Sequence, residues 1–159
     1  MQQTPDSPGA QAAELAAAMQ SGCLGMRVGR LQRLVARRFD QALRPLGVSL
    51  PQLEVLSTLV TAAAPVKPSD LAAWLFVERS TMSRNLALLE QRGLVKTSEV
   101  SPTGRMLRVG ITAAGIDALA EARGAWGAAQ GALRDVVGDD AVSTLDAWLE
   151  DLAVQDAAV

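Results

Sequence analysis

Short polar side chains and one arginine share a face of the helix predicted over residues 78–93. The apolar stripe of this helix recurs at i, i+4 and i+7 and consists of Met82, Leu86 and Leu89. At about 100° per residue, Ser80 and Arg84 lie opposite that stripe. Hydrogen-bonding side chains with a positive charge suit a helix that enters a DNA groove. An ordinary solvated surface helix fits the same pattern.

Two start signals precede this helix. Ser49 and Gln52 have the spacing of a capping box, and Pro68-Ser69-Asp70 begins a second, shorter helix. A tight connection at Phe76–Arg79 then leads into the polar-faced helix, which Gly93 ends. Two short helices with a turn between them predict a helix-turn-helix.

A β-hairpin is predicted directly after Gly93. Its strands are Leu94–Val100 and Arg105–Ile111, and the Ser101–Gly104 segment between them is typical of a type I turn. A hairpin that follows a recognition helix is a wing. Arg105 would lie near its tip.

Helices are also expected on both sides of this region. Residues 1–11 are polar and Pro-containing and are expected to be a disordered arm. A helix over 12–22 is followed by one over 24–43, whose arginine-rich side is either solvated or paired with the acidic C-terminal segment. Thr112 would cap a long helix that Gly138 ends, and a last helix follows. The long helix contains glycines that imply close packing by another helix or a subunit, at positions Gly115, Gly124, Gly127 and Gly131.

Composition excludes several classes of protein. The chain has 159 residues, no histidine and one cysteine. We find no paired cysteines, no phosphate-binding glycine loop and no membrane-spanning or secretory segment, so we expect no enzymatic activity, no metal, no cofactor and no membrane association. The cytoplasm is the expected location.

Charge is distributed unevenly. The net charge is −2. Residues 79–108 nevertheless carry six Lys or Arg side chains against two carboxylates, a balance of +4. Such a patch can attract DNA even on an acidic protein.

Three segments together resemble the MarR family of bacterial transcription regulators. They are LRPLGVSLPQLEVL (43–56), LAAWLFVERSTMSRNLALLEQRGLV (71–95) and TGRMLRVGITAAG (103–115). The resemblance spans roughly residues 23–152. It implies a homodimer held by N- and C-terminal helices, with the helix at 79–92 in the major groove and the wing in the adjacent minor groove.

The resemblance also implies roles for particular residues. Recognition-helix positions are filled by Ser80, Thr81, Ser83, Arg84 and Asn85, and the wing arginine is Arg105. Ser69 and Arg79 are further candidate DNA-binding residues. Arg84 either reads guanine or binds phosphate, and Asn85 lies close enough to the apolar stripe to touch phosphate or cap locally instead.

Two positions depart from the family pattern. Phe76 stands where a small residue, often Gly, is usual; because Phe disfavours positive φ, we expect another turn geometry. Thr103 replaces an acidic residue that orients the wing arginine, which predicts a less firmly held Arg105.

Members of this family commonly respond to small aromatic acids or to cysteine oxidation. Met26, Arg27 and Trp74 are candidate pocket residues, although Met and Trp at helical spacing more often pack in the core. Cys23 resembles a sensing cysteine at a helix start, but it lies two residues early and the chain has no tyrosine.

The predicted fold is mostly α with a small β-hairpin wing, a winged helix-turn-helix with N- and C-terminal dimerisation helices. Its parts are the arm (1–11), an N-terminal dimerisation region (12–48), the DNA-binding lobe (49–112) and C-terminal dimerisation helices (113–159). The predicted function is a transcriptional regulator, a homodimeric repressor that binds a pseudo-palindromic double-stranded DNA operator and is released by a small aromatic or lipophilic effector. The alternatives are a redox sensor that acts through Cys23 and a winged helix that binds only proteins.

Overall fold

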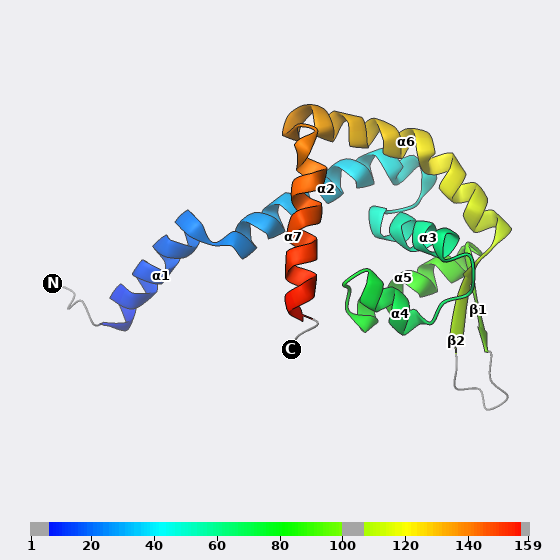
Figure 1. The fold of residues 1–159 in the computed structure, drawn as a ribbon, viewed down its shortest axis with the longest axis horizontal. Coiled ribbons are helices and arrows are strands. Elements are labelled where there is room, and N and C mark those ends of the chain that lie inside the picture. The colour runs from blue at the N-terminus through cyan, green and yellow to red at the C-terminus, as the bar shows by residue number, and fades with distance from the viewer. Residues whose placement is uncertain (1–6, 100–106, 157–159) are drawn as a thin grey trace. The chain divides into compact units, whose positions relative to one another are not determined.

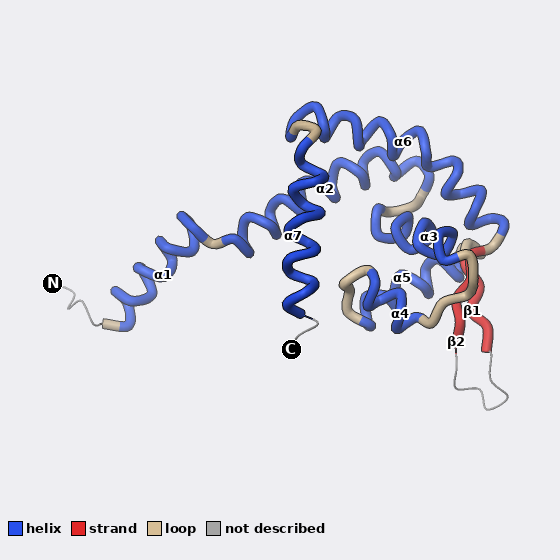
Figure 2. The backbone as a smooth tube through the Cα atoms, in the orientation of Figure 1, coloured by secondary structure: helices blue, strands red, loops and turns tan. Residues whose placement is uncertain are grey.

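The computed structural model describes residues 7–99 and 107–156 (Figures 1 and 2). The chain consists of two compact units, residues 1–38 and 39–159. The elements are α1 (Pro8–Gly22), α2 (Leu24–Leu43), the short 3-10 helix η1 (Arg44–Leu46), α3 (Leu50–Ala62), α4 (Pro68–Trp74), α5 (Arg79–Gln91), β1 (Val95–Glu99), β2 (Leu107–Ile111), α6 (Ala113–Val137) and α7 (Asp140–Asp156). No helix in the described ranges is long and apolar enough to cross a membrane.

The first unit contains α1 and most of α2. Helix α1 begins at Pro8 because Ser7 caps it, its side chain accepting a hydrogen bond from the Ala10 N–H at 3.3 Å. The predicted boundary of the arm, residue 11, was therefore placed too late. Cys23 adopts extended backbone angles between the two helices, which confirms the predicted break near Ser21-Gly22.

The second unit begins with the last turn of α2, where Phe39 and Leu43 are buried. The Gln52 side chain accepts a hydrogen bond from the Ser49 N–H at 3.1 Å, as the predicted capping box requires. Gln52 is itself buried, so this bond also satisfies a polar group inside the protein. The start of α3 is thus fixed by residues that the sequence identifies.

The core of this unit is aliphatic. Its largest fully buried side chains come from α2 through β2 and are Leu43, Val55, Leu56, Leu71, Met82, Leu89, Val95 and Val109. Each such side chain contributes about 1.5–3 kcal/mol of burial free energy. Helix α5 is therefore held by its apolar stripe, and the opposite face is left to solvent.

The turn between α4 and α5 differs from expectation. Phe76 has a φ of 50°, in the left-handed region, so the prediction that the turn would avoid positive φ was wrong. The Phe76 N–H donates to the Ala73 carbonyl at 3.2 Å, and the Val77 N–H donates to the Ala72 carbonyl at 3.0 Å. These two bonds form a Schellman motif, which requires a left-handed residue at this position. The backbone pattern therefore overrides the preference of the side chain.

Strands β1 and β2 form the predicted antiparallel hairpin, with Val95 opposite Ile111 and Glu99 opposite Leu107. Val66, which precedes α4, adds an isolated bridge to Val109 through backbone bonds of 2.9 and 2.8 Å. This bridge is not predicted from the sequence. The predicted turn at 101–104 lies outside the described residues.

Thr112 caps α6 as predicted, and its hydroxyl accepts from the Gly115 N–H at 3.0 Å. A Cβ atom at Gly115 would lie 2.1 Å from the Leu94 carbonyl oxygen, which explains the glycine at this position. At Gly124, Gly127 and Gly131 the described residues leave a Cβ atom free of contacts within 4 Å. The close packing expected along the rest of α6 is therefore not supplied within the described part of the chain.

Candidate nucleic-acid interface

Helix α5 presents the predicted polar face to solvent. Arg79, Ser80, Ser83 and Arg84 are exposed. Met82, Leu86 and Leu89, on the opposite side, are buried. The helical periodicity in the sequence therefore assigns the inside and the outside of this helix correctly.

Two candidate residues lie at the flanks of that face. Thr81 and Asn85 are half-buried, in agreement with the flanking positions predicted from the helical wheel. The Arg84 guanidinium donates to the Thr81 hydroxyl at 3.2 Å. Because Arg84 has five N–H donors, this bond orients the side chain and leaves most donors available for a bidentate contact.

Some of the positively charged side chains in residues 79–108 form hydrogen bonds within the protein. Arg92, at the end of α5, donates to the Gly47 carbonyl and, at 3.3 Å, to the Leu46 carbonyl. Arg108 donates to the Pro65 carbonyl at 3.4 Å. These arginines hold loops, so the charge count overstates the number of cations available to phosphates. Arg105 lies outside the described residues.

The end of α5 is also joined to the hairpin. The Glu90 carboxylate accepts a hydrogen bond from the Thr97 N–H at 2.8 Å. Gly93, with a φ of 71°, turns the chain from helix to strand. Together with Arg92, these contacts fix α5 to its neighbours on two sides.

A groove lies between α4 and the start of α5. Its volume is about 530 Å³, and it is lined by Ser69, Ala72, Ala73, Phe76, Val77, Glu78 and Arg79. Ser69 is exposed, and its hydroxyl donates to the Asp70 carboxylate at 3.3 Å. Two candidate DNA-binding residues from different helices, Ser69 of α4 and Arg79 of α5, therefore line the same groove.

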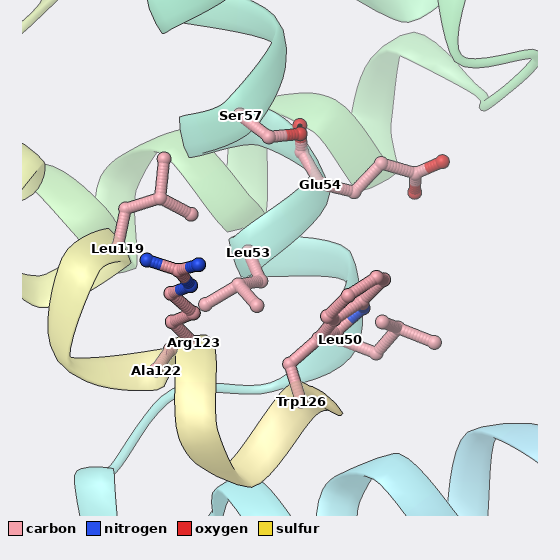
Figure 3. A pocket seen from close by; sticks show the side chains of 8 residues that line it. All are labelled: Leu50, Leu53, Glu54, Ser57, Leu119, Ala122, Arg123 and Trp126. Atoms are coloured by element: carbon pink, nitrogen blue, oxygen red, sulfur yellow. Dashed lines mark hydrogen bonds between the residues drawn. The ribbon is translucent and has the colours of Figure 1, made fainter. Parts of the chain in front are cut away.

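A second cavity lies between α3 and α6 (Figure 3). Its volume is about 390 Å³, and it is lined by Leu50, Leu53, Glu54, Ser57, Leu119, Ala122, Arg123 and Trp126. In Figure 3 the Arg123 guanidinium lies near Leu119 and Leu53, while the Glu54 carboxylate points away from it. Desolvation by burial raises the pKa of the Glu54 carboxyl above its usual value.

The predicted effector residues do not line this cavity. Met26 is half-buried, Arg27 donates to the Ser21 carbonyl at 2.5 Å, and Trp74 is about half exposed. Their part in ligand binding stays a prediction. The cavity residues recur at i, i+3 and i+4 on both helices, a signal that the sequence contains but that does not show which helices face each other.

Cys23 is a free, half-buried cysteine directly before α2. Its carbonyl accepts the Arg27 N–H at 3.3 Å, which places the residue at the start of the helix, as predicted. Its redox role stays a prediction.

Comparison with known proteins finds similarity to the MarR family. A sequence model of the MarR family matches residues 46–106. No curated protein sequence matches the chain. The chain is similar to the Mycobacterium tuberculosis transcriptional regulator MosR in complex with DNA, at 29% identity over 86% of this chain and 99% of that one, with a TM-score of 0.73.

Two structures of CouR are also similar. The transcriptional repressor CouR bound to a 23-mer DNA duplex shares 27% identity over 85% of this chain and 95% of that one, with a TM-score of 0.71. CouR from Rhodococcus jostii RHA1 bound to p-coumaroyl-CoA shares 24% identity over 84% and 93% of the two chains, with a TM-score of 0.70, and bears on the fold alone. The chain thus matches the MarR family model over residues 46–106 and has the winged-helix fold of MarR-family regulators.

Proposed function

We propose that this protein is a sequence-specific double-stranded DNA-binding transcriptional regulator, with residues 49–112 as its DNA-binding lobe. The observation that carries the proposal is the exposed polar face of α5, where Arg79, Ser80, Ser83 and Arg84 stand opposite a buried apolar stripe. The similarity to DNA-bound MosR and CouR supports it. Helix α5 would enter the major groove, and the hairpin would reach the adjacent minor groove.

Fluorescence anisotropy with duplexes from the promoter region beside its own gene tests this proposal. We expect specific binding that falls steeply with salt, because several phosphates are neutralised per subunit. Arg84→Ala should cost about 1–3 kcal/mol and relax the preference at one base pair if Arg84 reads a base. A uniform loss over all sequences would assign Arg84 to phosphate. Arg134→Ala, which removes an exposed arginine from the last turn of α6, is the matched control.

Binding to a partner protein but to no duplex at low salt would refute the DNA-binding function. That result would leave the winged helix as a protein-interaction module.

We also propose that the protein acts as a homodimer through its N- and C-terminal helices. Helix α7 has large exposed apolar side chains, at Leu145, Trp148, Leu149 and Leu152. Helix α2 likewise exposes Leu24, Val28, Leu31 and Leu34. Apolar faces of this extent usually mark contact surfaces. A dimer would place two recognition helices about one helical turn of DNA apart, on a pseudo-palindromic operator. Sedimentation equilibrium would refute this if the chain is monomeric at micromolar concentration.

The cavity between α3 and α6 supports repression that a small aromatic or lipophilic effector relieves. Leu50, Leu53 and Trp126 offer an apolar wall, and Arg123 offers a cation. A screen of aromatic acids and their thioesters for release of the bound duplex tests this. An effector that acts equally on wild type and Trp126→Ala would exclude this cavity as its site.

Cysteine oxidation is the alternative trigger, favoured by the free thiol of Cys23 at the start of α2. Peroxide should then weaken DNA binding of the wild type and leave Cys23→Ser unaffected. Unchanged affinity in both proteins would exclude it.

A further inference from the structure

Phe76 occupies a backbone conformation that its side chain disfavours. Its φ of 50° lies in the left-handed region, where glycine is free of the steric conflict that a Cβ atom creates. The Schellman bonds at the end of α4 require this conformation but involve only backbone atoms. Glycine would therefore serve the turn better than phenylalanine.

The ring of Phe76 does not compensate by packing in the core. The side chain is 71% exposed, more than any other aromatic residue that the structure describes. Exposed apolar area of this size contributes little to the free energy of folding. An unfavourable backbone angle combined with an unburied ring is better explained by a contact outside the chain.

The groove beside α4 indicates what this contact is. Ser69 and Ala73 lie one helical turn apart on α4, and Phe76, just beyond the end of this helix, lines the same groove. Arg79, the first residue of the recognition helix, lines the same groove. Phe76 thus lines one groove with two of the candidate DNA-binding residues, Ser69 and Arg79.

The charges of the groove favour an apolar contact. Glu78 and Arg79 bring one charge of each sign, so the groove has no excess positive charge to attract phosphate. The distinctive group is the aromatic ring. The apolar groups that a duplex offers at its grooves are the thymine C5-methyl group and the edge of the deoxyribose, and phenylalanine is a known partner of the thymine methyl.

We propose that Phe76 is a DNA-binding residue that packs its ring against an apolar group of the operator DNA, beside Ser69 and Arg79. The inference rests on the proposed DNA-binding function. It assigns to the turn of the helix-turn-helix a contact that the recognition helix alone does not make.

Phe76→Gly and Phe76→Ala test the proposal in the same anisotropy assay. Both variants remove the ring, and only the first relieves the left-handed backbone, so their common effect reports the ring. We expect each to bind the operator on the order of tenfold more weakly, the range for removing one buried aromatic contact. Phe76→Gly should at the same time raise the melting temperature.

Ala63→Gly is the matched control. Ala63 also has a left-handed backbone, with a φ of 54°, but it lies at the end of α3 and does not line the groove. It should raise the melting temperature without changing the DNA affinity. Operators with single thymine-to-uracil replacements identify the partner. A loss at one thymine in the wild type that disappears in Phe76→Gly indicates the methyl group, whereas uniform weakening of Phe76→Gly without such a position indicates deoxyribose.

Wild-type affinity in both Phe76 variants, with the wild type bound to its operator, would overturn this inference and leave the proposed function intact. Failure of the wild type to bind any duplex would overturn both.

Discussion

The two helices of the helix-turn-helix end in the same way but with different residues. At the end of α4, the N–H groups of Phe76 and Val77 bond back to the helix at 3.2 and 3.0 Å. At the end of α5, the N–H groups of Gly93 and Leu94 do so at 2.8 and 2.9 Å. The φ angles are 50° and 71°. Both helix ends therefore have the same backbone hydrogen bonds, and only the residue at the left-handed position differs.

This difference shows that the space around the left-handed position does not determine which residue occupies it. A Cβ atom at Gly93 would meet nothing within 4 Å among the described residues. Gly93 therefore serves the backbone alone, as the left-handed position prefers. Phe76, by contrast, is a bulky residue at a left-handed position in a turn that is also exposed. Where the backbone demands are equal, a residue that costs stability indicates a role other than folding.

The largest expected effect on stability concerns the contact between Gly115 of α6 and Leu94, just beyond the end of α5. Gly115→Ala would place a Cβ atom 2.1 Å from the Leu94 carbonyl oxygen, a backbone atom that cannot move aside easily. We expect a loss on the order of 3 kcal/mol in the free energy of unfolding, measured by urea denaturation. Gly124→Ala, an open helical position, should instead gain about 1 kcal/mol. Equal effects of the two variants would contradict the close approach.

The next largest effect concerns Arg92, because among the described residues such an arginine anchor is found at the end of α5 and not at the end of α4. Arg92→Ala removes the donors to the carbonyls of Leu46 and Gly47. Bonds from a charged donor at an exposed site predict a loss of about 1.5 kcal/mol. Arg84→Ala is the control and should leave the unfolding midpoint unchanged. A midpoint for Arg92→Ala equal to that of the wild type would show that the anchor adds no stability.

Exchanging the residue type at the two ends should have effects of opposite sign. Gly93→Ala should destabilise the protein by about 1 kcal/mol, because alanine is strained at positive φ. Phe76→Gly should stabilise it by a similar amount, about 1 kcal/mol, for the converse reason. Differential scanning calorimetry measures both. A decrease in melting temperature for Phe76→Gly would mean that the ring stabilises the turn after all.

The smallest expected effect concerns Glu54, away from both helix ends. Burial raises the pKa of its carboxyl above the usual 4.5, so the folded state holds this proton more tightly than the unfolded chain. The corresponding stability is present at low pH and is lost as the pH rises through the raised pKa. The free energy of unfolding of the wild type relative to Glu54→Gln should therefore fall as the pH rises from below the usual pKa of 4.5 through the raised pKa. A constant difference would contradict the shift.

Local rules predict much of the fold from the sequence. The capping pairs at Ser49 and Thr112, the apolar stripe of α5 and the left-handed Gly93 all depend on residues close together in the chain, at most seven positions apart. Phe76 was misjudged because the preference of a side chain was weighed without the hydrogen bonds that fix its backbone. Val66 has a single bridge partner and therefore shows no strand pattern.

The candidate sites likewise divide into those formed by residues close together in the chain and those formed by distant segments. The exposed residues of α5 were predictable because one helix carries them. The cavity between α3 and α6 was not, because its walls are about 70 positions apart in the chain and periodicity identifies faces but not their partners. The groove beside α4 depends on the left-handed turn at Phe76. Because another turn geometry was expected there, the groove could not be predicted.

The two-sided attachment of α5 restricts how its orientation can change. Arg92 holds the helix end to the loop before α3, and Glu90 holds the same turn to β1. Rotation of α5 about its own axis would break both attachments at once. In the proposed dimer, a change that releases DNA would therefore displace each lobe as a rigid body and alter the distance between the two recognition helices. The spacing of the operator half-sites, rather than the orientation of any base-reading side chain, would then be the quantity that regulation controls.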